Sequence, residues 1–176
     1  MIKNIKLVIV DVDGVLTDGT IYVDSQGCEI KAFHVLDGTG ISYLHRAGIK
    51  TAIISGRNCD AVIHRAKELG IEDVYQGAKN KIDAYGKIIE KYALRDEEVC
   101  YIGDDLIDLP ILRRVGFPVA VANASPLVKK HAAYITKAKG GGGAVREAAE
   151  KILKFQDKWD FIMERYQKPD IQGEKV

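Results

Sequence analysis

Short runs of apolar residues alternate with longer amphipathic segments along most of the chain. The apolar runs cover residues 7–10, 51–54, 74–75, 99–102, 119–121 and 134–135. Short, continuous runs rich in Val and Ile are typical of strands that are buried on both faces of a parallel sheet. The alternation therefore predicts an α/β fold in which helices connect the strands of a doubly wound parallel sheet.

The segments between these runs have the periodicity of amphipathic helices. We expect helices at residues 40–46, 59–69, 81–92, 106–115 and 144–166. Gly48, Gly70 and Gly116 follow three of them. Glycine is common at the C-terminal end of a helix because it readily takes a left-handed conformation. The first four of these helices would return the chain across the sheet, as parallel pairing requires.

One stretch, near residues 18–33, departs from this alternation. Residues 20–23 and 29–33 resemble strands, and the turn-like sequence Asp-Ser-Gln-Gly at 24–27 separates them. The stretch therefore predicts a β-hairpin that projects from the sheet after the first strand. Because no linker interrupts the pattern, we expect a single domain over residues 1–166 and a polar C-terminal tail over residues 167–176.

The composition favours one domain that acts on a small molecule. The chain has 176 residues, of which 47% are hydrophobic, and its 26 basic residues nearly balance 25 acidic ones. This length supports one well-buried core. The lack of a basic block argues against a nucleic-acid partner. No apolar run approaches the roughly 18 residues that a membrane-spanning helix needs, so we expect no membrane insertion.

Cysteine usage and the N-terminal sequence predict a cytoplasmic location. Cys28, Cys59 and Cys100 are an odd number and form no CxxC pair. The N-terminal residues lack the long apolar stretch of a secretory signal. We therefore expect the protein to work in a reducing compartment, with Cys100 in the core.

Polar side chains follow the predicted strands at four places. Asp11 and Asp13 come directly after the first strand, in the sequence Asp-Val-Asp-Gly-Val-Leu-Thr-Asp at 11–18. The other segments are Ser55-Gly56-Arg57, the lysine-containing stretch at 77–81 and Gly-Asp-Asp-Leu-Ile-Asp at 103–108. Each segment alone is more often an ordinary turn, helix cap or solvated surface. Because the carboxyl ends of parallel strands meet at one edge of a sheet, we expect the segments to converge on a site.

These residue types suit phosphoryl transfer, which needs a nucleophile, neutralised phosphoryl oxygens and a proton for the leaving alkoxide. Asp11 is the expected nucleophile, since a carboxylate can form an aspartyl-phosphate. Asp13 is the expected general acid and base, because an extended chain would direct its side chain like that of Asp11. Asp104 and Asp11 offer the oxygen ligands that Mg²⁺ prefers. The sequence therefore predicts Mg²⁺-dependent phosphoryl transfer.

Three further residues are expected to assist this chemistry. Ser55 can donate a hydrogen bond to a phosphoryl oxygen. Lys81 can offset the negative charge of several aspartates that would otherwise oppose an anionic substrate. Asp108 lies four residues beyond Asp104, about one helical turn, and could orient either Lys81 or metal-bound water.

The four segments together resemble the four sequence motifs of the haloacid dehalogenase-like phosphohydrolases, and the match spans most of the chain. This resemblance implies a Rossmann-like fold and an aspartyl-phosphate intermediate. It also implies that Asp11, Asp104 and the backbone carbonyl of Asp13 bind Mg²⁺. An aspartate at the position of Asp13 is similar to the phosphatases of this superfamily, whereas the dehalogenases lack it.

The spacing of the motifs leaves no room for a large cap domain, either between Asp18 and Ser55 or between Arg57 and Lys81. A capless site is open to water, so we expect a second subunit to cover it, with the hairpin as an interlocking element. The hairpin, residues 37–41 and residues 140–147 resemble the 3-deoxy-D-manno-octulosonate 8-phosphate (KDO 8-P) phosphatases. That resemblance implies a homotetramer that releases KDO and phosphate in lipopolysaccharide precursor synthesis.

The residues expected to bind the sugar-acid substrate are Ser55, Gly56, Arg57 and Lys81. Arg57 can form a bidentate pair with a carboxylate. Arg146 and Lys139 flank a glycine run at 140–143, and the resemblance makes them candidates for reaching a neighbouring subunit's site. The glycine run itself is predicted to be a mobile loop outside catalysis, since no phosphate-binding strand–loop–helix pattern surrounds it.

Three other functions stay open at the level of the sequence. A phosphatase of nonulosonate 9-phosphates or of another sugar phosphate would use the same motifs. A receiver-like signalling module also takes up phosphate at an acidic sheet edge, although receivers place the phosphorylated acid on a later strand. A non-catalytic subunit could retain the fold, but the complete set of catalytic groups argues against it.

Overall fold

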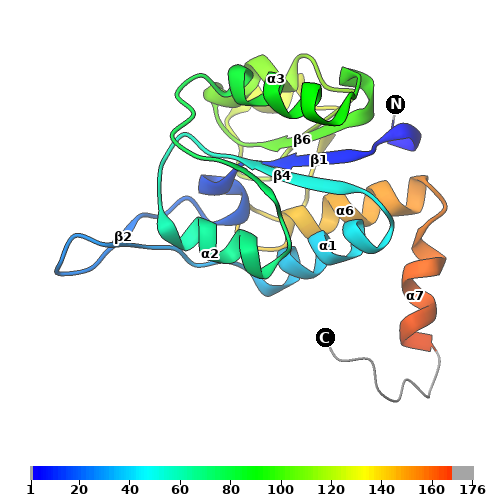
Figure 1. The fold of residues 1–176 in the computed structure, drawn as a ribbon, viewed down its shortest axis with the longest axis horizontal. Helices are drawn as coiled ribbons and strands as arrows, with labels where there is room; N and C mark the ends of the chain where they lie inside the picture. The colour runs from blue at the N-terminus through cyan, green and yellow to red at the C-terminus, as the bar shows by residue number, and fades with distance from the viewer. Residues whose placement is uncertain (1, 168–176) are drawn as a thin grey trace.

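A computed structural model describes residues 2–167, which contain a six-stranded sheet. In spatial order the strands are β5 (Asp73–Tyr75), β4 (Lys50–Ile54), β1 (Leu7–Val10), β6 (Val99–Gly103), β7 (Phe117–Ala120) and β8 (Tyr134–Ile135). Every pairing between neighbours is parallel, so the carboxyl ends of the strands share one edge (Figure 1). The chain builds outward from β1 in both directions, which confirms the predicted doubly wound sheet and places a topological switch point beside β1.

Helices cover both faces of this sheet (Figure 1). On one face lie α1 (Val35–Arg46), α2 (Asp60–Glu68) and α6 (Ala144–Phe155); α3 (Lys81–Tyr92) and α4 (Leu109–Leu112) lie on the other. The remaining helices are α5 (Pro126–His131) and α7 (Trp159–Gln167), and single turns occur at Ile2–Asn4, Val12–Leu16, Asp96–Glu98 and Leu106–Asp108. The short helix α5 was not predicted.

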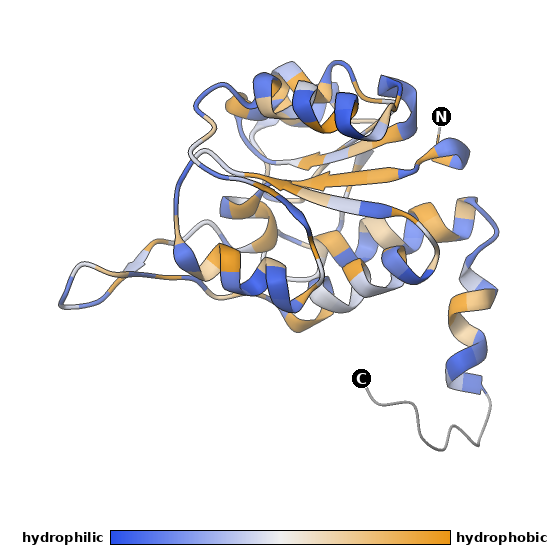
Figure 2. Cartoon of the chain, in the orientation of Figure 1, coloured by the Kyte–Doolittle hydropathy of each residue, from blue (hydrophilic) through white to orange (hydrophobic). Residues whose placement is uncertain are grey.

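The central strands are apolar because both of their faces are covered. All four residues of β1 are at most 1% exposed, and Figure 2 shows the hydrophobic colour along these strands. β1 pairs with both neighbours, so that Val10 lies opposite Ile53 on one side and Ile102 on the other. Full burial of one such side chain contributes about 1.5–3 kcal/mol to folding. The core therefore fixes the sheet edge at which the acidic segments begin.

The predicted hairpin is present and projects from the body of the molecule (Figure 1). Its strands, β2 (Tyr22–Val23) and β3 (Glu29–Ile30), are antiparallel and shorter than the sequence suggested. At the turn, the carboxylate of Asp24 accepts hydrogen bonds from the backbone N–H groups of Gln26 and Cys28. The side chains of β2 are exposed, and an isolated ribbon of this length is marginal in water.

The first crossover helix begins earlier than predicted. α1 starts at Val35 rather than at residue 40, and the His34 side chain accepts a hydrogen bond from the N–H of Leu36. Glycines at 38 and 40 lower the helix propensity of this segment. Gly40 is needed for packing, because a Cβ at this position would lie 2.8 Å from the Cα of Arg146 in α6. Tertiary packing therefore overrides propensity in α1.

The prediction of a single helix over residues 144–166 is wrong. α6 ends at Phe155, and Asp157 takes a left-handed conformation with φ of 57° before α7 begins at Trp159. Trp159 packs edge-on against Tyr43 of α1, with ring centroids 6.1 Å apart. No glycine or proline marks this break in the sequence. Gln167, predicted as the first residue of the tail, belongs to α7, and residues 168–176 of that tail lie outside the described residues.

The predicted helix at residues 106–115 is also shorter. It consists of the turn at Leu106–Asp108 and the four-residue α4, with Pro110 in the first turn of α4. Gly116 does not end it in a left-handed conformation. A Cβ at Gly116 would lie 2.4 Å from the carbonyl oxygen of Glu97, so a close backbone approach explains this glycine.

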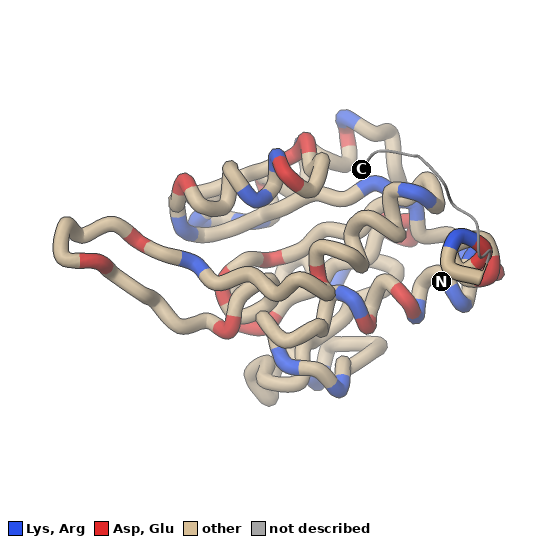
Figure 3. The backbone as a smooth tube through the Cα atoms, turned by 90° about the horizontal axis from the view of Figure 1, so that it is seen from below, with Lys and Arg blue, Asp and Glu red and all other residues tan. Residues whose placement is uncertain are grey.

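Charged residues of both signs are mixed along the described chain (Figure 3). No helix within residues 2–167 combines the length and the apolar character that a membrane span requires.

Candidate active site

Asp11 begins a tight turn directly after β1. Its backbone N–H donates to the carbonyl of Ile102 in β6 at 3.1 Å, and its Oδ1 accepts from the N–H of Val12 at 2.7 Å. Gly14 takes a left-handed conformation with φ of 89°, and Thr17 Oγ1 accepts from the N–H of Gly14 at 3.3 Å. These bonds hold the Asp11 carboxylate, which is 5% exposed, at the end of the strand.

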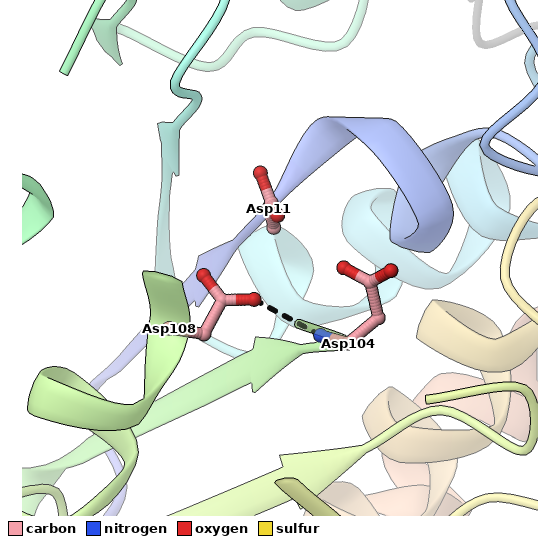
Figure 4. Close-up of side chains that lie close together, drawn as sticks. All are labelled: Asp11, Asp104 and Asp108. Atoms are coloured by element: carbon pink, nitrogen blue, oxygen red, sulfur yellow. Dashed lines mark hydrogen bonds between the residues drawn. The ribbon is translucent and has the colours of Figure 1, made fainter. Parts of the chain in front are cut away.

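Three carboxylates lie close together at this edge of the sheet (Figure 4). Asp11, Asp104 and Asp108 each place one oxygen within 4.8 Å of the others. Asp104 follows β6, and its carboxylate lies against the turn after β1. A Cβ on Gly14 would be only 2.1 Å from Asp104 Oδ2, so this approach requires glycine. The convergence expected from the strand order is therefore present for these three acids.

Lys81 and Asp108 are the most deeply buried charged residues at this cluster. Lys81 is the first residue of α3, is 2% exposed, and places Nζ 2.8 Å from Oδ1 of both Asp11 and Asp108. Asp108 also accepts from the hydroxyl of Tyr101 at 2.6 Å and from the backbone N–H of Asp104 at 3.0 Å. Both oxygens of Asp108 are thus engaged. Asp108 therefore positions Lys81 and the Asp104 loop instead of offering a free ligand.

The electrostatics of the cluster leave an excess of negative charge. Burial, together with the charge of Asp108, raises the pKa of Asp11 to about 7 despite the opposing charge of Lys81. Burial and Asp108 also raise the pKa of Asp104 to about 7, again against Lys81. Burial lowers the pKa of Lys81, but its two carboxylate partners outweigh this effect and the pKa is raised. Three carboxylates therefore share a single ammonium group.

The donor atoms suit a hard divalent cation. Asp104 Oδ1 is buried and has no hydrogen-bond partner within residues 2–167, which is costly unless another ligand satisfies it. The neighbouring atoms that could bind a metal are carboxylate oxygens, which Mg²⁺ and similar ions prefer as ligands. Asp11 and Asp104 can therefore hold such an ion, and its charge would balance the excess.

Asp13 faces the hairpin and lies outside the three-carboxylate cluster. It lies in the turn that follows β1, and its charge is among those that raise the pKa of Asp104. Lys31, which follows β3, donates from Nζ to Asp13 Oδ1 and, at 2.6 Å, to Glu29 Oε1. Burial lowers the pKa of Lys31, but the two carboxylates outweigh it and the pKa is raised. Asp13 therefore has a lysine partner that the sequence did not indicate.

The segment after β4 lies beside the same hairpin. Ser55 is 1% exposed, and its Oγ accepts from the backbone N–H of Arg57 at 3.3 Å. The guanidinium of Arg57 pairs with Glu29 at 2.8 Å, and this pair, with Lys31, lowers the pKa of Glu29. A Cβ on Gly56 would lie 3.5 Å from the Ile107 side chain, in ordinary van der Waals contact. The Arg57 guanidinium, which was expected to pair with a substrate carboxylate, is thus already paired with Glu29.

Comparison with known proteins identifies the family. A family model described as haloacid dehalogenase-like hydrolase matches residues 70–148. The KDO 8-P phosphatase KdsC of Escherichia coli K12 is 49% identical over 158 residues, which are 90% of this chain and 84% of that protein. This chain belongs to the KdsC phosphatase family. The predicted resemblance and the enzyme class are therefore confirmed.

Solved structures of KdsC relatives have the same fold. The KDO 8-P phosphatase of Moraxella catarrhalis, solved with magnesium, phosphate and KDO, has a TM-score of 0.92 and 44% identity, covering 94% of this chain and 95% of that one. The cobalt-bound Haemophilus influenzae enzyme has a TM-score of 0.86 and 41% identity, covering 89% and 92%. The Rossmann-like fold is thus confirmed, and proteins with this fold hold divalent metals.

Two charged residues of this KdsC-family site, Glu29 and Lys31, were not predicted. The sequence indicated a hairpin but not which of its residues point toward the site. A usable signal exists, because Glu29 and Lys31 lie two apart in the predicted strand 29–33, where they would share a face, and they carry opposite charges. Charged residues on one face of a ribbon beside an acidic motif therefore merit attention as site residues.

The glycine run at 140–143 is a packed part of the site and not the predicted mobile loop. Gly141 donates from its N–H to the carbonyl of Val15 at 2.9 Å. A Cβ on Gly140 would lie 1.7 Å from the carbonyl oxygen of Gly14, so only glycine fits against this turn. Buried Asp37 accepts from the N–H of Gly143 at 3.2 Å and anchors the run to α1. The glycine run therefore packs against the turn that follows Asp11.

Arg146 and Lys139 differ in their surroundings. The guanidinium of Arg146 lies 4.4 Å from the ring centre of Tyr43 and pairs with Glu150 at 2.7 Å. Its side chain thus has two partners within its own chain. Lys139 is exposed, and Asp18, also exposed, accepts from the backbone N–H of Thr20 at 2.8 Å.

Proposed function

We propose that this protein is a Mg²⁺-dependent phosphatase that hydrolyses KDO 8-P to KDO and phosphate in the cytoplasm, as a step of lipopolysaccharide precursor synthesis. The observation that carries the proposal is the cluster of Asp11, Asp104 and Asp108 around Lys81 in a KdsC-family fold. An all-oxygen donor set beside one buried lysine suits the binding and transfer of a phosphoryl group.

In the first step, Asp11 attacks the phosphorus atom and forms an aspartyl-phosphate. The bond between phosphorus and the sugar oxygen breaks with its electron pair left on that oxygen, and Asp13 donates a proton to it. In the second step, Asp13 removes a proton from water, and the resulting hydroxide attacks the phosphorus atom and releases Asp11. The Asp13 side chain is partly exposed, at 24%, which supports this exchange with water.

Ser55 and Lys81 are the proposed stabilisers of the phosphoryl oxygens. Lys81 keeps its charge beside Asp11, which offsets part of the repulsion between the nucleophile and an anionic substrate. Ser55 lies at the end of β4, next to β1 in the sheet, with its hydroxyl buried. Gly56 has no side chain, so its backbone would let the phosphate approach closely.

Asp11, Asp104 and the backbone carbonyl of Asp13 are the proposed Mg²⁺ ligands. The ion would supply charge neutralisation of the transferring phosphoryl group. Two features of the chain hold Asp104 in place. The absence of a side chain at Gly14 leaves room for the Asp104 carboxylate, and the backbone N–H of Asp104 donates to Asp108.

Arg57 is the proposed partner of the substrate carboxylate. Since Glu29 already accepts from the Arg57 guanidinium at 2.8 Å, the substrate carboxylate would share or replace that partner. Arg57 is half-exposed, which leaves part of its donor fork available.

A homotetramer is the proposed assembly, with a neighbouring subunit covering each open site. The hairpin carries exposed apolar side chains, among them Tyr22, Val23 and Ile30. Exposed apolar residues grouped on a projecting ribbon favour burial against another copy of the chain.

A panel of phosphorylated sugar acids, assayed with and without Mg²⁺, tests the proposed function. KDO 8-P should have the highest kcat/KM, and a nonulosonate 9-phosphate is the closest alternative. Asp11→Asn should abolish turnover and keep the fold, whereas Asp160→Asn, a change of an exposed aspartate on α7, should leave turnover intact. Activity of Asp11→Asn equal to wild type would refute the mechanism. A higher kcat/KM for the nonulosonate 9-phosphate than for KDO 8-P would show that KDO 8-P is not the preferred substrate.

The receiver-like alternative is disfavoured by the place of Asp11. Asp11 follows the first strand of the chain, whereas receivers phosphorylate an acid on a later strand. Membership of a phosphatase family argues the same way.

A further inference from the structure

Lys31 has an almost completely buried side chain although it lies on a projecting hairpin. The side chain is 3% exposed, and its Nζ contacts the carboxylates of Asp13 and Glu29. Neighbouring hairpin residues are open to solvent, with Tyr22 45% and Ile30 55% exposed. Burial of an ammonium group is unfavourable unless carboxylates pair with it. The two carboxylates therefore determine where Lys31 lies.

The site has two buried lysines with separate partners. Lys81 contacts Asp11 and Asp108, and it comes from the start of α3. Lys31 contacts Asp13 and comes from the hairpin. The proposed nucleophile, Asp11, is thus paired with Lys81 of α3. The proposed general acid and base, Asp13, is paired with Lys31 of the hairpin.

The hydrogen bond from Lys31 distinguishes the two oxygens of Asp13. Nζ donates to Oδ1, and Oδ2 accepts no hydrogen bond from the part of the chain between residues 2 and 167. A protonated carboxyl group has one O–H donor, and the oxygen that accepts from an ammonium is the less suitable place for that proton. The transferable proton of Asp13 therefore belongs on Oδ2.

We propose that Lys31 is a positioning residue that orients the Asp13 carboxyl group, so that Oδ2 faces the leaving oxygen of the substrate. The inference rests on the proposed function, in which Asp13 protonates that oxygen as its bond to phosphorus breaks and the bond between phosphorus and Asp11 forms. The proton moves from Asp13 Oδ2 to the sugar oxygen. Lys31 keeps its own protons and acts only through Asp13.

Lys31→Met tests this role, because it removes the ammonium group and keeps a similar length. We expect kcat for KDO 8-P to fall about 100-fold, the contribution typical of general acid catalysis, while KM changes less than about threefold. Lys31→Arg, which keeps the charge and donors, should recover much of the lost kcat. Lys79→Met, which removes an exposed lysine before α3, is the matched control and should keep the wild-type kcat.

A double-mutant cycle separates positioning from a purely structural role. In an Asp13→Asn background, Lys31→Met should leave the residual kcat unchanged. An equal loss of kcat in both backgrounds would show that Lys31 does not act through Asp13 and would overturn the proposal. A raised KM with unchanged kcat would overturn it too, because Lys31 would then bind the substrate.

Folding and the proposed function need separate checks. Circular dichroism melting shows whether each variant folds, and Lys31→Gln replaces Lys31→Met if the latter does not. Inactive Asp11→Asn together with a normal kcat for Lys31→Met would refute only the role of Lys31. Full activity of Asp11→Asn would refute the proposed function itself.

Discussion

Asp11 and Asp104 face each other in a buried site where Lys81 is the nearby cation. Their carboxyl groups bind protons in the folded protein at pH values where an exposed aspartate is ionised, since each pKa is raised to about 7. At the residue scale, the burial of several carboxylates beside one lysine makes the metal-free site unstable when it is ionised. A divalent cation relieves this cost.

A pH dependence follows from these raised pKa values. At Asp11 and Asp104 the folded metal-free protein binds more protons than the unfolded chain between pH 3.8 and about 7, so the contribution of these two groups to stability falls as the pH rises through that range. Mg²⁺ binds the ionised carboxylates, so it should raise the melting temperature more at pH 8 than at pH 6. Thermal melts with and without Mg²⁺ measure this difference, and Asp104→Asn should lose most of the response. A Mg²⁺ response that does not change with pH would contradict the account.

Gly14 offers a second test at the residue scale. Gly14→Ala adds a Cβ at a φ of 89° and 2.1 Å from Asp104 Oδ2, so the variant should lose both stability and most of its activity. Gly27→Ala is the matched control, since Gly27 has a φ of 83° but nothing within 4 Å. The control should lose only the strain of a left-handed alanine, about 1–2 kcal/mol. Equal activity of the two variants in a phosphatase assay would show that the contact with Asp104 does not matter.

The hairpin is the element that joins the site to its surroundings. Through Glu29 and Lys31 it contacts Arg57 and Asp13, while its apolar side chains face solvent. Its two-residue strands provide little stability of their own. We therefore expect the hairpin to be ordered by charge pairs at its base and by a neighbouring subunit at its exposed apolar surface.

Val23→Asp tests that expectation, because it places a charge at a position that is 60% exposed in the single chain. The wild-type protein should sediment as a tetramer, and Val23→Asp should shift it toward smaller species without unfolding it. Leu127→Asp on α5, at a position 43% exposed, is a control that should keep the assembly. Sedimentation velocity measures the outcome, and an active wild-type monomer would rule out the proposed assembly.

The elements that were predicted well are those whose formation depends mainly on the local sequence. The six strands were found because continuous apolar runs mark strands buried on both faces, and α3 has the predicted bounds of residues 81–92. The break between α6 and α7 was missed because Asp157 takes the left-handed conformation that usually calls for glycine, while the N–H of Lys158 donates to the carbonyl of Leu153. The pairing of Lys31 with Asp13 depends on how the hairpin folds back, which spacing alone does not determine.

At the scale of the whole molecule, the parallel sheet explains why the site is where it is. The acids that follow β1 and β6 meet because these two strands are neighbours, with Lys81 brought in by α3. The glycine run before α6 completes the support of the Asp11 turn. We therefore expect the chemistry to depend on covalent capture of phosphate by Asp11 at the end of the central strand.

Rapid acid quenching during turnover of KDO 8-P with Mg²⁺, followed by digestion and mass spectrometry, tests this central claim most directly. The account predicts one added phosphoryl group on the peptide that contains Asp11, and none in Asp11→Asn. Phosphate on another residue, or turnover by Asp11→Asn at the wild-type rate, would contradict it.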